Sequence, residues 1–312
     1  MLTQPIEIES SSGDHKIWGI LWLPNDTNNI KGIIQISHGM CEYVERYSDF
    51  AVYMCSKGYA VCGNDHIGHK NTAKISSQQL GYFGNTESWR TIIEDLETFR
   101  QRIRKSIPNA PMIMLGHSMG SFIARLYAAK YGDKLDGLII SGTGAKNPSI
   151  PFAKVMAKTV AFCKGDRYIS PFIDNTFSKT LNGKMKNPRT KVDWVCSDEK
   201  VVDKYLADKY CTFTFSTSAF YNLFCLNANS NKKECFESTP DKLPIFIFSG
   251  GDDPVGDMGK GPVKVGENYK KYGNKNVNVK IYPNRRHEML NEVNKQEVYA
   301  DVENWIGENV IK

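Results

Sequence analysis

Residues 116–120 read Gly-His-Ser-Met-Gly and place Ser118 where its hydroxyl could act as a nucleophile. The apolar run 110–115 before this motif predicts a strand, and residues 121–130 after it predict a helix. A serine on a sharp turn between a strand and a helix projects its hydroxyl above the edge of the sheet. Side chains at Gly116 and Gly120 would collide with the strand and the helix. We therefore interpret the motif as a nucleophile elbow rather than as a purely structural turn.

A serine nucleophile needs a general base, because a hydroxyl is weakly nucleophilic at neutral pH. A histidine takes the proton, and a carboxylate orients the histidine. Around an elbow of this kind the chain order is serine, acid, histidine. His287 is the only one of the six histidines downstream of Ser118, and it follows the predicted strand 277–282. The sequence therefore predicts His287 as the base.

The acid is expected in the loop after the predicted strand 243–249. That loop, residues 250–257, contains Asp252, Asp253 and Asp257. Aspartate is also common in turns for structural reasons. The residue pattern by itself leaves the choice between Asp252 and Asp253 open.

Two backbone N–H groups are needed to stabilise an oxyanion beside the serine. Met119 begins the predicted helix, where a free N–H and the helix dipole favour an anion. The second donor is expected after the predicted strand 33–36, in a loop that begins His-Gly-Met-Cys-Glu. Gly39 allows close backbone approach, so Met40 is the predicted second donor. We interpret His38 as a structural residue that shapes this loop.

Five segments resemble the monoacylglycerol lipase and lysophospholipase branch of the α/β-hydrolase family. They are residues 38–47 (the branch's His-Gly-x-x-Glu-x-x-x-Arg-Tyr segment), 65–69 (Asp-x-x-Gly-His), 116–120 (the elbow), 253–256 (the acid loop) and 286–288 (the histidine loop). Lys70 departs from the pattern, because a small residue is common there. In the family the aspartate directly before the residue pair Pro-Val is the acid, so the resemblance selects Asp253. Glu42 and Arg46, four residues apart, are expected to form a structural ion pair.

The alternation of strand and helix patterns between residues 32 and 141 predicts an α/β fold with a mainly parallel, doubly wound sheet. The alternation stops near Ala145 and resumes near Leu243. We therefore expect an α/β-hydrolase core formed by residues 1–145 and 242–312. The segment 146–241, rich in aromatic residues and interrupted by prolines, predicts short inserted helices. The resemblance implies that they form a helical cap (lid) over the site.

Composition and charge limit where the protein is expected to act and what it is expected to bind. The N-terminal residues lack the charged and apolar regions of a signal peptide, and no stretch is apolar for long enough to span a bilayer. The eight cysteines show no Cys-x-x-Cys pair and no zinc-ligand spacing, so free thiols in a cytoplasmic protein are expected. The net charge of +6 comes from scattered lysines, and nucleic acid is not an expected partner. Asp65, His66 and His69 have metal-ligand residue types without further ligands nearby, so no metal or cofactor is expected.

The resulting expectation is a serine hydrolase that cleaves lipid-type carboxylic esters, such as monoacylglycerols or lysophospholipids, through an acyl-enzyme. An aminopeptidase or amidase on the same fold and a non-catalytic binding module are the alternatives. Some cap aromatics could line an acyl-chain pocket. The basic run 184–191 could bring the cap into transient contact with an anionic head group or a membrane surface, although a solvated loop is the favoured interpretation.

Overall fold

The computed structural model describes residues 1–85, 87–293 and 295–311. The strands of this described part form one eight-stranded sheet in the order β1-β2-β4-β3-β5-β6-β7-β8. Their bounds are β1 (Leu2–Glu9), β2 (Lys16–Leu23), β3 (Ile33–Ser37), β4 (Ala60–Asn64), β5 (Met112–His117), β6 (Gly137–Ser141), β7 (Ile245–Gly250) and β8 (Val277–Tyr282). β1 and β2 pair antiparallel, as do β2 and β4, whereas the pairs from β4 to β8 are parallel. The predicted mainly parallel, doubly wound sheet is confirmed.

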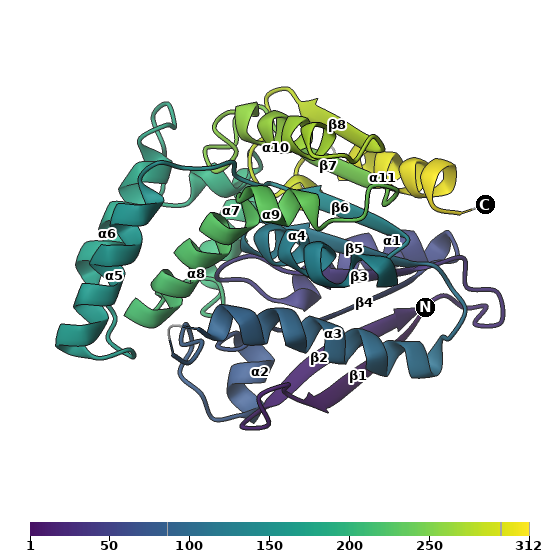
Figure 1. The fold of residues 1–312 in the computed structure, drawn as a ribbon, viewed down its shortest axis with the longest axis horizontal. Helices are drawn as coiled ribbons and strands as arrows, with labels where there is room; N and C mark the ends of the chain where they lie inside the picture. Colours follow the sequence, from purple (N-terminus) through teal and green to yellow (C-terminus); the bar gives the residue numbers. More distant parts are fainter. Residues whose placement is uncertain (86, 294, 312) are drawn as a thin grey trace.

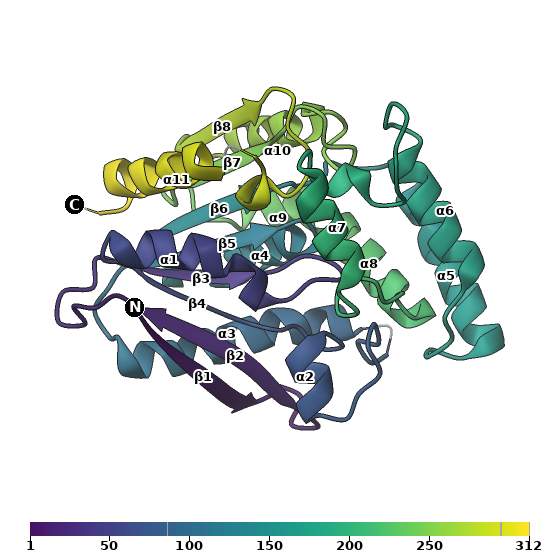
Figure 2. The ribbon, with the colours of Figure 1, turned by 180° about the vertical axis from the view of Figure 1, so that it is seen from behind.

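Helices cover both faces of this sheet. Figure 1 shows α3 (Ser88–Ser106), α4 (Met119–Tyr131) and α10 (Lys260–Lys271) on the near face. Figure 2, from behind, shows α1 (Ser48–Ser56) and α11 (Lys295–Asn309) on the other. Each strand feeds both layers, because successive side chains point to opposite faces. In β5, Met112 and Met114 join the core under α3 and α4, and Ile113 and Leu115 join the core under α1 and α11.

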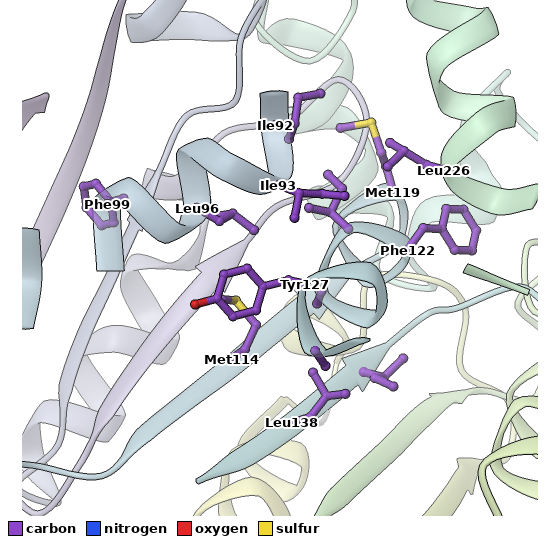
Figure 3. Packing of buried hydrophobic residues seen from close by; sticks show 14 of the residues in the cluster. Ile92, Ile93, Leu96, Phe99, Met114, Met119, Phe122, Tyr127, Leu138 and Leu226 are labelled. Atoms are coloured by element: carbon purple, nitrogen blue, oxygen red, sulfur yellow. The ribbon is translucent and has the colours of Figure 1, made fainter. Parts of the chain in front are cut away.

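The core beneath the elbow helix is closely packed. Figure 3 shows the apolar side of α3, including Ile92, Ile93 and Leu96, facing α4. These side chains stand at helical spacing along one face of α3, and each is at most 5% exposed. Leu226 of α8 (Thr217–Ser230) joins the same cluster as Met119. The helix that follows Ser118 is therefore fixed both by the sheet and by the inserted segment.

The segment between β6 and β7 consists of short helices, as expected. They are α5 (Ile150–Lys164), α6 (Pro171–Asn182), η3 (Asp193–Val195), α7 (Glu199–Ala207), α8 and α9 (Lys233–Glu237). Figures 1 and 2 show α5 and α6 at one end of the molecule, and α8 contacts both α5 and α4. We call α5 and α6 the outer helices. The cap boundaries at 146 and 241 stay a prediction.

Two helices have no counterpart among the expected elements. α2 (Lys70–Ile75) has only six residues, too few to show a helical period, and α10 contains glycine and proline. The 3₁₀ turn η1 (Val44–Tyr47) leads directly into α1. Short 3₁₀ turns also follow α4 (η2, Gly132–Lys134) and precede α11 (η4, Met289–Asn291). Within the described residues, no helix has the length and apolar character required to cross a bilayer.

Candidate active site

Ser118 stands on a strained turn between β5 and α4. Its backbone angles are φ 54° and ψ −120°, which lie outside the regions that non-glycine residues ordinarily occupy. A Cβ at Gly116 would lie 2.4 Å from the carbonyl oxygen of Gly120, and a Cβ at Gly120 would lie 1.9 Å from that of Ser37. The turn can form only because both flanking residues are glycine. Ser118 itself is half-buried.

Asp253 and His287 form a buried hydrogen-bonded pair at the carboxyl ends of β7 and β8. Nδ1 of His287 donates to Oδ2 of Asp253 at 3.0 Å. The same oxygen accepts from the hydroxyl of Ser249 at 2.9 Å, and Oδ1 accepts from the N–H of Val255 at 2.9 Å. This geometry leaves Nε2 of His287 as the ring nitrogen available to a substrate or nucleophile.

Burial and charge act in opposite directions on this pair. Burial alone would raise the pKa of Asp253, but the His287 charge and the hydrogen bonds from His287, Ser249 and Val255 hold it below its ordinary value. Burial alone would lower the pKa of His287, but the Asp253 carboxylate and its hydrogen bond raise it above its ordinary value. The carboxylate therefore stabilises a protonated imidazole at this position.

The turn after β6 contacts both Ser118 and His287. The N–H of Ser118 donates to the carbonyl of Ser141 at 3.0 Å. A Cβ on the next residue, Gly142, would lie 3.0 Å from both Cε1 and Nδ1 of His287. Nε2 of His287 is buried and has no hydrogen-bond partner among the described residues. The hydrogen bond between base and nucleophile is thus not formed in this structure, which is common in enzymes without bound substrate.

The three aspartates of the loop after β7 differ in burial and in their partners. Asp253 is fully buried and contacts His287, whereas Asp252 is exposed. Asp257 is bound to Lys184 of the inserted segment at 2.8 Å. Only Asp253 can orient the imidazole in this arrangement.

The two predicted oxyanion donors lie at the start of α4 and in the turn after β3. Met119 is the first residue of α4, and Met40 lies in the turn after β3. Neither backbone N–H makes a hydrogen bond to the described residues. Gly39 is held by its N–H, which donates to the carboxylate of Glu42, and a Cβ on Gly39 would lie 3.0 Å from Cβ of Ser118. Both N–H groups are therefore available, and their assignment to an oxyanion hole stays a prediction.

His38 supports the loop rather than the chemistry. Its Nδ1 donates to the carbonyl of Gly39 at 2.8 Å, and its Nε2 accepts from the N–H of His66 at 2.9 Å. Burial, with the neighbouring rings of His66 and His69, lowers the pKa of His38 well below its ordinary value. A neutral imidazole with both nitrogens in use cannot act as a base. The structural role expected for His38 is confirmed.

A three-member ion network ties the loop after β3, which carries Met40 and is called the oxyanion loop below, to the histidine loop. The expected pair between Glu42 and Arg46 forms at 3.1 Å. Arg46 also binds Glu288 with both terminal nitrogens, at 2.5 and 2.7 Å. Burial raises the pKa of Glu42 to about 7, an effect that the charge of Arg46 limits. The sequence predicted no role for Glu288, although its position next to His287 was a usable signal.

The residues of metal-ligand type in segment 65–69 are buried and have structural roles. The buried carboxylate of Asp65 accepts from the N–H groups of Val44 at 2.9 Å and Asn71 at 3.0 Å. Burial lowers the pKa of His66 to about 3 and that of His69 to about 4, so both rings are neutral. No group of three or more histidine, cysteine, aspartate or glutamate side chains is suited to a metal in the described part of the chain.

The strand order, the strained serine turn and the buried Asp253–His287 pair together define the α/β-hydrolase fold with a site of serine-hydrolase type. The chain belongs to the Hydrolase_4 family, described as "Serine aminopeptidase, S33", whose sequence profile matches residues 28–294. It is 24% identical to the monoacylglycerol lipase of Mycolicibacterium smegmatis, over 96% of this chain and 98% of that protein. It is also 24% identical to human monoglyceride lipase, over 92% of this chain and 85% of that protein.

Solved structures agree with this assignment. A thermostable carboxyl esterase from Bacillus coagulans, in complex with glycerol, superposes with a TM-score of 0.92 at 28% identity over the full length of both chains. A lipase in its open form superposes with a TM-score of 0.87 at 27% identity, again over both full chains. The protein is therefore a hydrolase of the α/β-hydrolase fold, within its esterase and lipase group.

Proposed function

We propose that the protein hydrolyses carboxylic esters of lipid type, such as monoacylglycerols or lysophospholipids, through an acyl-enzyme on Ser118. The observation that carries this proposal is the buried Asp253–His287 pair beside the strained Ser118 turn. The lipases and esterases among the related proteins support the ester class. The similarity to the Mycolicibacterium enzyme favours a monoacylglycerol as substrate.

Acylation begins when the hydroxyl of Ser118 attacks the ester carbonyl and Nε2 of His287 takes its proton. Asp253 holds the imidazole through Nδ1 and stabilises the imidazolium. The N–H groups of Met40 and Met119 bind the oxyanion of the tetrahedral intermediate. His287 then gives the proton to the departing alcohol oxygen, and the acyl group remains on Ser118.

Deacylation repeats these steps with water as the nucleophile. His287 takes a proton from the water, which attacks the acyl-enzyme carbonyl. The oxyanion is held by the same two N–H groups. Collapse of the second intermediate returns the proton to Oγ of Ser118 and releases the fatty acid.

The outer helices are suited to contact with a lipid surface. Phe162 is 91% exposed, Phe152 74% and Phe172 65%. Exposed Lys158 and Lys164 stand among these apolar residues. Large exposed aromatic residues with flanking lysines are typical of an interfacial segment. The proposal therefore places transient membrane contact on the outer helices of the cap.

The basic run 184–191 contributes less to such contact than its charge suggests. Lys184 is paired with Asp257 at 2.8 Å. Arg189 is paired with Asp203 at 2.6 Å. Two of its cations therefore have partners within the chain, in agreement with the favoured interpretation as a solvated loop.

A labelling experiment tests the nucleophile directly. A fluorophosphonate probe reacts with an activated serine, so we expect it to label the wild-type protein at Ser118. The variant Ser118→Ala, checked for folding by circular dichroism, is expected to stay unlabelled. Absence of labelling in a folded wild-type sample, or labelling elsewhere, would contradict the proposed chemistry.

A substrate comparison tests the lipid class. Lipid extracts are incubated with wild type or with Ser118→Ala and analysed by mass spectrometry. Loss of monoacylglycerols or lysophospholipids with release of fatty acid only in the wild-type reaction is expected. A reaction that leaves every acyl ester unchanged while p-nitrophenyl acetate is cleaved would remove the lipid part of the proposal.

An aminopeptidase is the second candidate, because the description of the family names that activity. One structural feature also favours it. The carboxylate of Asp174 on α6 is half-buried, makes no side-chain hydrogen bond to the described residues, and helps to raise the pKa of the Cys41 thiol in the oxyanion loop. A carboxylate there could bind a substrate ammonium group. Turnover of aminoacyl anilides without turnover of esters, lost in Asp174→Asn, would favour this candidate.

A further inference from the structure

The inserted segment contributes one aromatic side chain to the surroundings of His287. The ring of Trp194, in η3, lies 5.1 Å from the imidazole ring of His287 between centroids, at an interplanar angle of 51°. The ring of His117 lies 4.7 Å from the same imidazole. The backbone of Gly142 lies against its Cε1–Nδ1 edge. Among the described residues, hydrogen bonding holds the imidazole only at Nδ1, so these ring contacts restrict its remaining rotation.

The segment carrying Trp194 is bound to the histidine loop itself. The N–H of Glu288 donates to the carbonyl of Val195 at 2.7 Å. The side chain of Arg286 donates to the carbonyls of Asp193 and Cys196 at 2.6 and 3.0 Å. The two residues that flank His287 therefore both bind the backbone around Trp194.

A buried carboxylate extends this attachment. Glu292 accepts from the N–H of Ser197 at 2.9 Å, and its carboxylate also binds the hydroxyl of that residue. The same carboxylate accepts from the N–H of Arg286 at 2.8 Å. Segment 193–197 and the histidine loop thus share one hydrogen-bond network, which fixes the backbone of Trp194 relative to His287.

We infer that Trp194 is a positioning residue that holds the imidazole of His287 in the orientation needed to move protons to and from the reacting oxygens. The inference rests on the proposed function. An imidazole with one hydrogen bond can swing away from the serine, and a misplacement of about 1 Å can reduce the rate by about 100-fold. The indole face also attracts the positive charge that His287 acquires during acylation.

The experiment compares two ester classes in Trp194→Ala, Trp194→Phe and Trp18→Ala. An alkyl ester needs His287 to protonate its leaving oxygen, whereas a p-nitrophenyl ester leaves unassisted and needs His287 only as a base. We expect Trp194→Ala to lower kcat for the alkyl ester about 100-fold and for the p-nitrophenyl ester about 10-fold. KM should change little for both. Trp194→Phe keeps an aromatic face and should remain within about threefold of wild type.

Trp18→Ala is the matched control. Trp18 is also half-buried, but it lies on β2 in the cluster with α1. The substitution removes the same type of side chain and should change kcat for both esters by the same factor. Proton NMR gives an independent measurement, because the Nδ1 proton shared with Asp253 resonates far downfield. We expect this signal to persist in Trp194→Phe and Trp18→Ala and to be lost or broadened in Trp194→Ala.

The outcomes separate this inference from the proposed function. If Trp194→Ala lowers kcat for both esters equally and keeps the downfield proton signal, Trp194 has only a structural role. The inference is then wrong, while the proposed function stands. If wild type cleaves no ester faster than Ser118→Ala, the proposed function itself fails. A class-dependent loss that Trp194→Phe restores supports both.

Discussion

The turn around Ser118 and the outer helices show opposite kinds of packing. At the turn there is no room for one methyl group, since a Cβ on Gly120 would lie 1.9 Å from a carbonyl oxygen. On the outer helices, Phe162 leaves 91% of its surface exposed. The turn must hold an oxygen in one position relative to a base and two N–H donors, which requires a fixed backbone. The outer helices have only to present apolar surface, so their side chains need no partner in the folded chain.

The largest effect is expected from removing the nucleophile at the turn. Ser118→Ala takes away the attacking oxygen without adding any atom, so the fold should be unchanged. We expect kcat for ester hydrolysis to fall by about 10⁴-fold or more. Steady-state kinetics with p-nitrophenyl butyrate, after removal of any contaminating esterase, measure this. Residual activity within tenfold of wild type would mean that another group carries the reaction.

Filling the turn should break the fold itself. Gly120→Ala forces a methyl group into the carbonyl of Ser37, so we expect a loss of at least about 3 kcal/mol in the free energy of unfolding and loss of ester turnover. Gly307→Ala in α11 is the matched control, because a Cβ there meets no atom within 4 Å. It should raise stability by about 0.5–1 kcal/mol, since alanine favours helix more than glycine. Urea unfolding measures both, and equal effects would contradict the contrast between turn and surface.

The acid limb of the pH profile of kcat/KM tests how Asp253 controls the protonation of His287. Because the pKa of His287 is raised, the neutral base is lost as the pH falls through a value above the ordinary histidine pKa, and kcat/KM falls with it. Asp253→Asn removes the charge that opposes the effect of burial. We therefore expect the limb to move to lower pH in Asp253→Asn, with a much lower maximum. A limb that stays in place would show that Asp253 does not control the protonation of His287.

The smallest effect on the chemistry is expected from the outer helices. The double variant Phe152→Ser and Phe162→Ser should change kcat/KM for a short soluble ester by less than twofold and stability by less than about 0.5 kcal/mol. On monoacylglycerol in vesicles, its rate should fall several-fold, because less apolar area enters the lipid surface. Val263→Ser on α10, also exposed, is the control and should change neither rate. An unchanged rate on vesicles would remove the lipid-contact role of the outer helices.

Prediction from sequence was most successful where a local pattern carries the information. The strands around the elbow alternate with apolar helices, and their types and order follow from periodicity. It gave no bounds for the short helices of the insertion, and it missed α2 and α10, which are short or contain glycine and proline. Trp194 could be recognised only as one of several cap aromatics, because no local pattern distinguishes a residue that contacts His287 from one that fills the cap.

The sequence by itself determined the strand-turn-helix around Ser118, the mainly parallel sheet and the short set of residues able to complete a proton relay. These features depend on neighbours in the chain: periodicity, turn residues and the order of motifs. Tertiary structure decided which loop aspartate is buried against His287, that Glu288 joins Glu42 and Arg46, and that Trp194 reaches the imidazole. Those contacts join residues far apart in the chain, and burial and charge act on them only after the sheet brings its loops together.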